Sequence, residues 1–246
     1  MGSPKELVVN EINSGAYCFQ VESLLSGVKE IGAKGPKKEH FLTDILEILR
    51  AKGGKINAYV SQSPEEVLGV NSRVQLSNVE RIANRRILER LMLSGVTILD
   101  PASTYVDCDV EVGPDSIIYP GTILRGKTRI GRLCRIGPFC HIGDSQIGDD
   151  CEVRMSQVAG ARLLEKCHVG PFSNIRPEST LGPDVKIGNF SEVKASRIGL
   201  GSKVSHLSYI GDAEIAEDVN IGAGTITCNT TGSGSTRRRS EPRLSS

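Results

Sequence analysis

The stretch TRIGRLCRIGPFCHIG, residues 128–143, repeats one pattern along the chain. Ile130, Ile136 and Ile142 are six residues apart, and each is followed by glycine. In steps of five or six, the same series runs through Val106, Val112, Ile118, Leu124, Ile147, Val153, Val158, Leu164, Val169, Ile175, Leu181, Ile187, Val193, Ile198, Val204, Ile210, Ile215 and Ile221. Such a hexapeptide repeat predicts a left-handed parallel β-helix.

Each repeat of this kind supplies one short strand and one turn, and three repeats complete a coil of a triangular prism. The aliphatic residue points inward, and glycine, aspartate or asparagine serves the corners, where positive φ costs little. A small residue four positions after the aliphatic one must also fit inside, as at Ser116, Thr122, Thr128, Cys134, Cys140, Ser173, Ser179, Ser191, Ser202 and Thr225. The series is long enough for about seven coils. An antiparallel sandwich would instead show a period of two.

The composition of the chain excludes several classes of protein. Its 246 residues carry a net charge of +1, which gives no basis for binding nucleic acid or a membrane surface. No run approaches the roughly 18 apolar residues of a membrane span, and the N-terminus lacks the apolar core of a signal peptide. Seven cysteines without CxxC spacing, several of them in the small inward position, predict buried free thiols in a reducing, cytoplasmic compartment.

Residues 1–72 do not carry the repeat. Helical spacing of apolar residues covers 21–31 and resumes at 43–53, and a strand is expected at 56–60. This order of elements is an α/β pattern, but about 70 residues make only a small core. We therefore expect the C-terminal remnant of an α/β domain.

Three further segments follow in the chain. Residues 73–95 predict a linker helix with one apolar and one basic face, which ends at Gly95. An incomplete β-helix domain occupies 96–229. The low-complexity, arginine-rich segment 230–246 is expected to be a disordered basic tail.

Polar residues that could take part in catalysis or binding gather near the end of the repeat. His206 follows an inward position by two residues, while Arg176, Lys194 and Asp212 recur at equal intervals of three hexapeptides, about one coil each. We expect these charged groups to line one edge of the prism. Two cations and a neutral imidazole suit a substrate that carries both a phosphate and an amine, because the imidazole can accept the proton of the attacking amine. The alternative interpretation is that these charged residues only keep the exposed edge of the prism soluble.

A metal site is the alternative use of the histidines. His141, His168 and His206 could bind zinc if neighbouring coils held them in one register. Their spacing does not give one register, so the sequence disfavours this site.

Several motifs resemble a known family. In the repeat they are Arg176-Pro177, Glu192-Val193-Lys194, HLSYIGDAEI at 206–215 and VNIGAGTITCN at 219–229; before it they are NEINSG at 10–15 and LGVNSR at 68–73. Together they resemble the bifunctional family that joins glucosamine-1-phosphate N-acetyltransferase to N-acetylglucosamine-1-phosphate uridyltransferase and makes UDP-N-acetylglucosamine. The resemblance covers about residues 5–229.

The resemblance implies a role for each matching residue of the acetyltransferase half. His206 would be the general base that takes a proton from the amine of glucosamine-1-phosphate as it attacks acetyl-CoA. Arg176 and Lys194 would hold the sugar phosphate. Tyr209 and Asn220 would bind the sugar.

The resemblance also implies contacts with the other ligands. Ala223 and Asn229 would lie near acetyl-CoA. Asn13 would contact the bound UTP or UDP-N-acetylglucosamine, and Asn71 would touch both this nucleotide and the Mg²⁺ of the uridyltransferase. By the same resemblance the protein would form a homotrimer through its prisms.

The sequence departs from the family's pattern at both ends. The glycine-rich phosphate loop and the Mg²⁺-binding aspartate of the uridyltransferase are absent, so we expect an internal fragment with a truncated uridylyl-transfer domain. After Asn229 the family has a tyrosine and further coils that supply most of the CoA surface, whereas this chain has Thr230-Thr231-Gly232 and the basic tail. The chain alone is therefore expected to be impaired or inactive.

Two other functions stay open at this point. One is a different hexapeptide acyltransferase that acts on serine or a lipid precursor, although the α/β remnant and the linker helix argue against it. The other is a non-catalytic β-helix fragment that trimerises without chemistry.

Overall fold

The computed structural model describes residues 11–32, 40–228, 230–231, 234–235 and 238–240. The chain divides into two compact units, Met1–Val79 and Glu80–Ser246.

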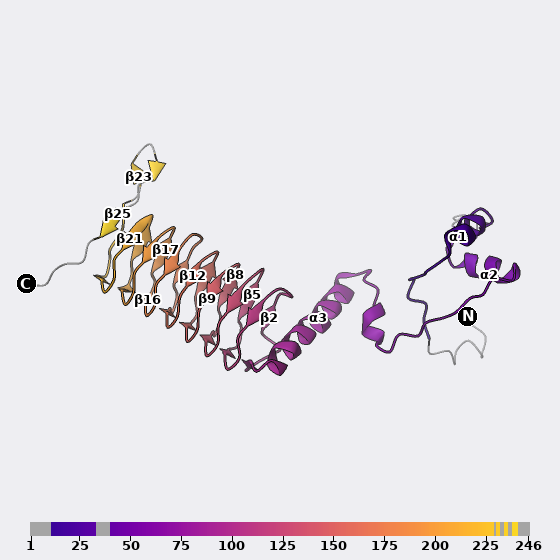
Figure 1. The fold of residues 1–246 in the computed structure, drawn as a ribbon, viewed down its shortest axis with the longest axis horizontal. Helices are drawn as coiled ribbons and strands as arrows, with labels where there is room; N and C mark the ends of the chain where they lie inside the picture. The colour runs from indigo at the N-terminus through magenta and orange to yellow at the C-terminus, as the bar shows by residue number, and fades with distance from the viewer. Residues whose placement is uncertain (1–10, 33–39, 229, 232–233, 236–237, 241–246) are drawn as a thin grey trace, which may run out of the picture. The chain divides into compact units, whose positions relative to one another are not determined.

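The second unit is a parallel β-helix, which confirms the expected fold class (Figure 1). Its first sheet contains β1 (Thr97–Ile98), β4 (Ile117–Ile118), β7 (Arg135–Ile136), β10 (Glu152–Val153), β13 (His168–Val169), β16 (Lys186–Asn189), β19 (Lys203–His206) and β22 (Asn220–Ile221). Its second sheet contains β2 (Tyr105–Val106), β5 (Ile123–Arg125), β8 (His141–Gly143), β11 (Gln157–Ala159), β14 (Asn174–Ile175), β17 (Glu192–Lys194) and β20 (Tyr209–Gly211). Its third sheet contains β3 (Glu111–Val112), β6 (Arg129–Ile130), β9 (Gln146–Ile147), β12 (Arg162–Leu163), β15 (Thr180–Leu181), β18 (Arg197–Ile198), β21 (Ala213–Ile215) and β25 (Arg238–Ser240).

Every third strand along this series lies beside its predecessor, so the described residues build about seven coils of three strands. The aliphatic positions stack inside the prism, as where Ile118 pairs with Ile136 and Ile136 with Val153. All the expected inward aliphatic residues are buried except Leu164 and Ile221. The small inward positions are likewise buried, apart from Thr225.

The expected inward position of Leu164 was wrong. Leu163 is 1 % exposed and pairs with Ile147 on one side and Leu181 on the other. The spacing from Val158 is therefore five residues and not six. Because strand side chains alternate between faces, a shift by one residue turns Leu164 away from the core.

The corners of the prism match the expected corner composition only in part. Asp115, Asp150 and Asp218 have positive φ, as the sequence predicts for tight corners. At the corner between the first and second sheets, however, the positive-φ residues are Phe139, Met155, Phe172, Phe190 and Leu207. The rings of Phe172 and Phe190 stack with centroids 5.4 Å apart, a contact that offsets part of the cost of left-handed backbone.

The helix α3 (Arg73–Leu93) forms where the sequence predicts a helix, and Gly95 follows it with φ of 95°. Within the second unit, Leu88 and Leu91 of this helix join the core of the prism. The Asn84 amide donates to the Thr104 carbonyl at 2.8 Å and accepts from the Val106 N–H at 3.1 Å. β2 is the first strand of the second sheet, so no earlier strand can bond to its outer edge. The Asn84 side chain makes hydrogen bonds to the backbone there instead.

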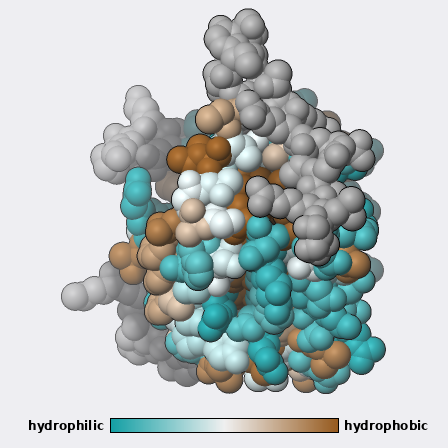
Figure 2. Space-filling model, turned by 90° about the vertical axis from the view of Figure 1, so that its left-hand side faces the viewer, coloured by the Kyte–Doolittle hydropathy of each residue, from teal (hydrophilic) through white to brown (hydrophobic). Residues whose placement is uncertain are grey.

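At the opposite end, apolar residues reach the surface. Val219 and Ile221 pack on the core but are only partly buried, and Ile226 is 68 % exposed. Figure 2, which views the side at the left of Figure 1, shows hydrophobic residues among hydrophilic ones here. In the tail, β25 pairs in parallel with β21, and β23 (Thr230–Thr231) pairs with β24 (Gly234–Ser235). These paired strands differ from the disorder expected for 230–246, while residues 232–233, 236–237 and 241–246 of that segment lie outside the described residues.

The first unit contains α1 (Val21–Val28), α2 (Asp44–Ala51) and a 3₁₀ turn, η2 (Pro64–Val67). The two helices pack together, with Ile45 fully buried against Gly27. The strand expected at 56–60 is wrong: these residues form no strand, and Tyr59 is 92 % exposed. A strand needs a partner to satisfy its backbone, and none of the described residues supplies one. No helix in the described part of the chain is long and apolar enough to cross a membrane.

Candidate active site

His206 is the last residue of β19, at the corner where the chain turns from the first sheet into the second. Asn189 occupies the same position in the preceding coil, and the two residues pair in parallel register. Nδ1 of His206 lies 2.7 Å from Oδ1 of Asn189. The imidazole is exposed, so it is open to a ligand that binds on the outside of the prism.

Arg176 and Lys194 lie at the other end of the strands of the second sheet. Arg176 donates its backbone N–H to Val193 at 2.8 Å, which sets it beside Lys194 in the next coil. Its guanidinium also donates to the Glu192 carboxylate at 2.8 Å. This hydrogen bond raises the pKa of Arg176 above its ordinary value. The arrangement presents two neighbouring cations to an anionic group.

Tyr209 lies between these two ends. It pairs with Glu192 in the second sheet, and Lys194 pairs with Gly211. A Cβ added at Gly211 would overlap the Tyr209 hydroxyl, which shows that the ring lies along its own strand toward Gly211. Because Lys194 pairs with Gly211, one corner and the strand Tyr209–Gly211 lie along the chain between His206 and the position beside the two cations.

The third charged residue expected at this edge, Asp212, is displaced by one position. Glu192 pairs with Tyr209, so this coil is one residue shorter than three full hexapeptides. Lys194 therefore lies beside Gly211, while Asp212 takes the next corner with φ of 50°. The sequence spacing brings Arg176 and Lys194 together and leaves Asp212 outside their column.

Asn220 and Ala223 belong to the coil that follows His206. Asn220 is exposed and pairs with Lys203 at the start of β19. Continuing this register sets Ala223 beside His206, and the N–H of Gly224 donates to the Leu207 carbonyl at 3.1 Å. Ala223 is thus the closer of the two to the imidazole. Asn229 lies outside the described residues.

Asn13 and Asn71 belong to the first unit, and both are exposed. Asn13 accepts from the Gly15 N–H at 3.0 Å and donates to the Tyr17 hydroxyl. The Asn71 N–H donates to Oε1 of Gln75 at 2.8 Å at the start of α3. In the described ranges no group of three or more His, Cys, Asp or Glu side chains could hold a metal ion. Because Mg²⁺ prefers carboxylate ligands, the described surroundings of Asn71 do not fit the expected Mg²⁺ site.

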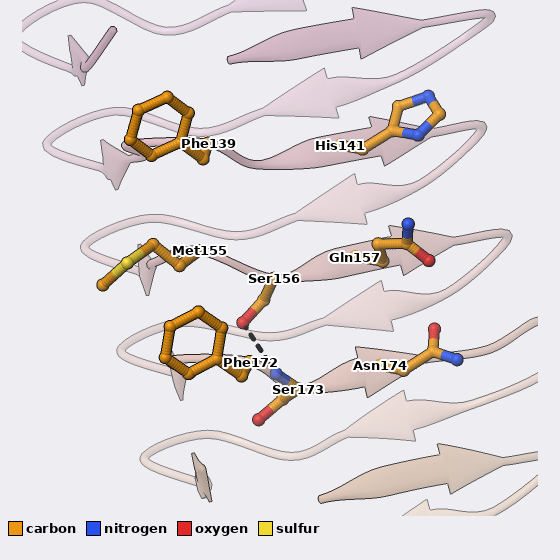
Figure 3. Close-up of a pocket in the computed structure, with 8 residues that line it drawn as sticks. All are labelled: Phe139, His141, Met155, Ser156, Gln157, Phe172, Ser173 and Asn174. Carbon is orange, nitrogen blue, oxygen red and sulfur yellow. Dashed lines mark hydrogen bonds between the residues drawn. The ribbon is translucent and has the colours of Figure 1, made fainter. Parts of the chain in front are cut away.

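A cavity of about 500 Å³ lies elsewhere on the second sheet. Figure 3 shows Phe139, Met155 and Phe172 along one side of it and His141, Gln157 and Asn174 along the strands. Asn174 pairs with Glu192, so the cavity lies on the same sheet as the candidate site but in earlier coils. None of the expected site residues lines it.

Two neighbours of the expected site residues were missed in the sequence. Asn189 contacts His206 and Glu192 contacts Arg176, each from a neighbouring coil. The signal that could have found them is the coil period, since each of these contacts joins positions about one coil apart in the sequence.

Solved structures and family models give the following comparison. LpxA from Acinetobacter baumannii matches with a TM-score of 0.45 and 17 % identity, over 61 % of this chain and 70 % of that protein. PerB from Caulobacter crescentus, solved in complex with CoA and GDP-perosamine, matches with a TM-score of 0.39 and 20 % identity, over 71 % of this chain and 86 % of that protein. No protein-family model matches the chain.

Curated proteins give a higher identity. The bifunctional protein GlmU of Trichlorobacter lovleyi is 46 % identical over 228 residues, which are 92 % of this chain and 50 % of that protein. That of Clostridioides difficile is 48 % identical over 225 residues, which are 92 % of this chain and 49 % of that protein. The chain thus spans about half the length of the curated relatives it matches. This similarity, over nearly all of its own sequence, makes the chain a homologue of the bifunctional GlmU proteins.

Proposed function

We propose that the β-helix transfers an acetyl group from acetyl-CoA to the amine of glucosamine-1-phosphate. The observation that carries this proposal is the arrangement of His206 at the corner before the strand Tyr209–Gly211, and of Arg176 and Lys194 in the coils beside the end of that strand. A base and a pair of cations in neighbouring coils can address the amine and the phosphate of one small sugar. The homology to the GlmU proteins supports the same chemistry.

His206 acts as the general base in this proposal. As the amine nitrogen forms a bond to the thioester carbonyl carbon, the imidazole accepts the proton that the nitrogen loses. The tetrahedral intermediate then collapses, and the carbon–sulfur bond breaks. The CoA sulfur leaves and takes the proton from the imidazolium, which restores the neutral base.

The remaining residues bind and orient the substrates. Arg176 and Lys194 hold the phosphate, with Glu192 keeping the guanidinium in place until the ligand arrives. Tyr209 and Asn220 bind the sugar. Ala223, beside His206, leaves room for the acetyl group because its side chain is only a methyl group, and Asn229 contributes to acetyl-CoA binding.

A comparison of acceptors tests the proposal. The full chain is incubated with acetyl-CoA and either glucosamine-1-phosphate, glucosamine or serine, and acetylated products are measured by mass spectrometry. We expect the phosphorylated amino sugar to be preferred, and replacing Arg176 by alanine to remove most of that preference over glucosamine. Equal rates with glucosamine, or preference for serine, would reject the proposed substrate.

The residues proposed for the uridylyl-transfer half could bind a nucleotide but could not catalyse its reaction. Asn13 and Asn71 would contact a bound uridine nucleotide, UTP or UDP-N-acetylglucosamine. Two amides cannot by themselves stabilise phosphoryl transfer, which needs positioned cations around the phosphate.

A second candidate function is a trimerising module without chemistry. The observation that favours it is the exposed apolar corner, where Phe139 is 69 % and Phe190 57 % exposed. Large exposed apolar side chains in a row are typical of protein contacts. Sedimentation of the purified chain together with the acceptor assay separates the two: a homotrimer with no acetylated product supports the module, and a trimer with product supports the enzyme.

A further inference from the structure

The side chain that contacts the His206 ring belongs to Asn189, a residue to which the proposed chemistry gives no role. Their separation, 2.7 Å from Nδ1 to Oδ1, is a short hydrogen-bond distance. An amide oxygen only accepts hydrogen bonds. The contact therefore requires the proton of a neutral imidazole to be on Nδ1.

The backbone around this pair holds the two side chains in place. β16 and β19 pair in parallel at Lys186 with Lys203, at Ile187 with Val204 and again at Asn189 with His206. Both residues are followed by a left-handed corner residue, Phe190 with φ of 56° and Leu207 with φ of 44°, and the Leu207 N–H donates to the Asn189 carbonyl at 3.1 Å. The two coils therefore turn in the same way at this point.

The strands also approach closely just before the pair. A Cβ added at Gly188 would overlap the carbonyl oxygen of Ser205. Glycine at 188 thus permits a strand separation that a larger residue would widen. The closeness keeps Asn189 within reach of the next coil.

We propose that Asn189 is a positioning residue that holds His206 in the Nδ1-protonated tautomer, so that Nε2 is the base of the reaction. This inference rests on the proposed function, because it names the nitrogen that receives the proton of the substrate amine. In a neutral imidazole, a hydrogen bond donated by one ring nitrogen fixes the proton there and leaves the other nitrogen unprotonated, so that it can act as a base.

The direct test measures the tautomer and needs no activity. The full chain is labelled with ¹⁵N-histidine, and the His206 signals are assigned by their loss in His206→Ala. In the neutral ring we expect Nδ1 to be protonated in the parent and in Asn189→Asp, which keeps an acceptor oxygen. Asn189→Leu, of similar shape but without an acceptor, should lose this preference. A parent protonated on Nε2, or a tautomer unchanged in Asn189→Leu, would overturn the inference.

Kinetics give the second readout. Because the general base contributes about 10²–10⁴-fold to such reactions, we expect Asn189→Leu to lower kcat by about tenfold to a hundredfold. KM for glucosamine-1-phosphate should stay near the parent value, and Asn189→Asp should keep most of the rate. Gln146→Ala, which removes an exposed amide from the third sheet, is the matched control and should leave both constants unchanged.

The two readouts separate the inference from the function on which it rests. If the parent transfers no acetyl group, the proposed function fails, and the tautomer still decides the role of Asn189. If transfer occurs and Asn189→Leu raises KM alone, Asn189 contacts substrate and does not position the base, which overturns the inference.

Discussion

Individual side chains on the outside of the prism pair with those of the neighbouring coil. Arg125 contacts Asp107 at 2.9 Å and Arg129 contacts Glu111 at 3.3 Å, in each case from one coil to the adjacent one. Exposed ion pairs of this kind contribute about 0–1 kcal/mol each. They adjust stability, while the buried aliphatic stack inside supplies most of it.

Asp107 gives this pairing a pH dependence. Burial acts to raise the pKa of its carboxyl, but the Gly126 N–H and the Arg125 guanidinium outweigh burial and lower the pKa below 3.8. A carboxylate with a lowered folded pKa stabilises the fold above its unfolded pKa, and this contribution disappears as the pH falls through the folded value. We expect Asp107→Asn to be less stable than the parent at neutral pH, with the difference vanishing in acid.

Urea unfolding at neutral and acid pH measures this difference. Asp109→Asn, whose recorded side-chain partner is the Cys108 thiol, is the control and should show a smaller loss at neutral pH. A difference for Asp107→Asn that stays constant from neutral to acid pH would contradict the assignment.

Single residues also show where sequence patterns stop being informative. The inward aliphatic positions follow from the six-residue period, yet Leu163 and Leu164 are chemically identical, so only the strand register decides between them. Asn189 carries no pattern of its own. Its importance depends on which residue of the next coil lies beside it, and that register changes wherever a coil is one residue short of three hexapeptides.

At the scale of helices and strands, the two ends of the β-helix are covered to different extents. At the first coil, Asn84 of α3 satisfies the backbone of β2, and Leu88 and Leu91 cover the core. At the last coil the inward residues Val219 and Ile221 are only partly buried. An open end of a solenoid exposes backbone groups and core to solvent.

The role of Asn84 is directly testable. Asn84→Ala leaves the Thr104 carbonyl and the Val106 N–H without their side-chain partner, which should cost about 1–3 kcal/mol of unfolding free energy. Alanine is the better helix former, so the loss cannot come from helix propensity. Chemical denaturation measures it, with Arg81→Ala on the exposed part of α3 as control. A loss no larger than that of the control would show that α3 closes the coil through its apolar residues alone.

Elements outside the repeat were predicted less completely. Helical spacing gave α1, α2 and α3 with small errors at their ends, because local periodicity determines a helix. Residues 56–60 have strand composition, but a strand depends on a partner, and no described residue provides it. The strand β25 lies in a segment whose composition predicts disorder, and it pairs with the available edge of β21.

Across the chain as a whole, the cysteines divide by location. Cys18, Cys108 and Cys228 are exposed, whereas Cys134, Cys140, Cys151 and Cys167 are buried in the prism. The buried free thiols match the expectation from their small inward positions. Burial also raises the pKa of the Cys140 thiol, which suppresses the reactive thiolate.

We therefore expect three thiols of the native chain to react rapidly with a disulfide reagent and four to react only after denaturation. Spectrophotometric titration with and without denaturant measures both numbers. As a control, Cys140→Ser should reduce the slow group by one and leave the fast group unchanged. Rapid reaction of all seven would mean that the prism opens readily in solution.

The candidate site shows which features of a surface can be predicted from the sequence of a β-helix and which cannot. The coil period was enough to place Arg176 beside Lys194 and Tyr209 in the next coil of the same sheet, while His206 ends a strand of the first sheet just before Tyr209. The cavity beside Phe139 left no comparable signal, because it arises from the shapes of side chains in three successive coils. Periodic backbone geometry is readable from sequence, while surface shape depends on packing.

The proposed chemistry depends above all on His206. Its test is acetyl transfer from acetyl-CoA to glucosamine-1-phosphate by the full chain, compared with His206→Ala and Gln146→Ala. We predict acetylated product from the parent and from Gln146→Ala, and a rate at least about 10²-fold lower for His206→Ala, since the general base is lost. Equal rates for the parent and His206→Ala would contradict the role of His206 as the base, and no product from the parent would favour the non-catalytic module over the enzyme.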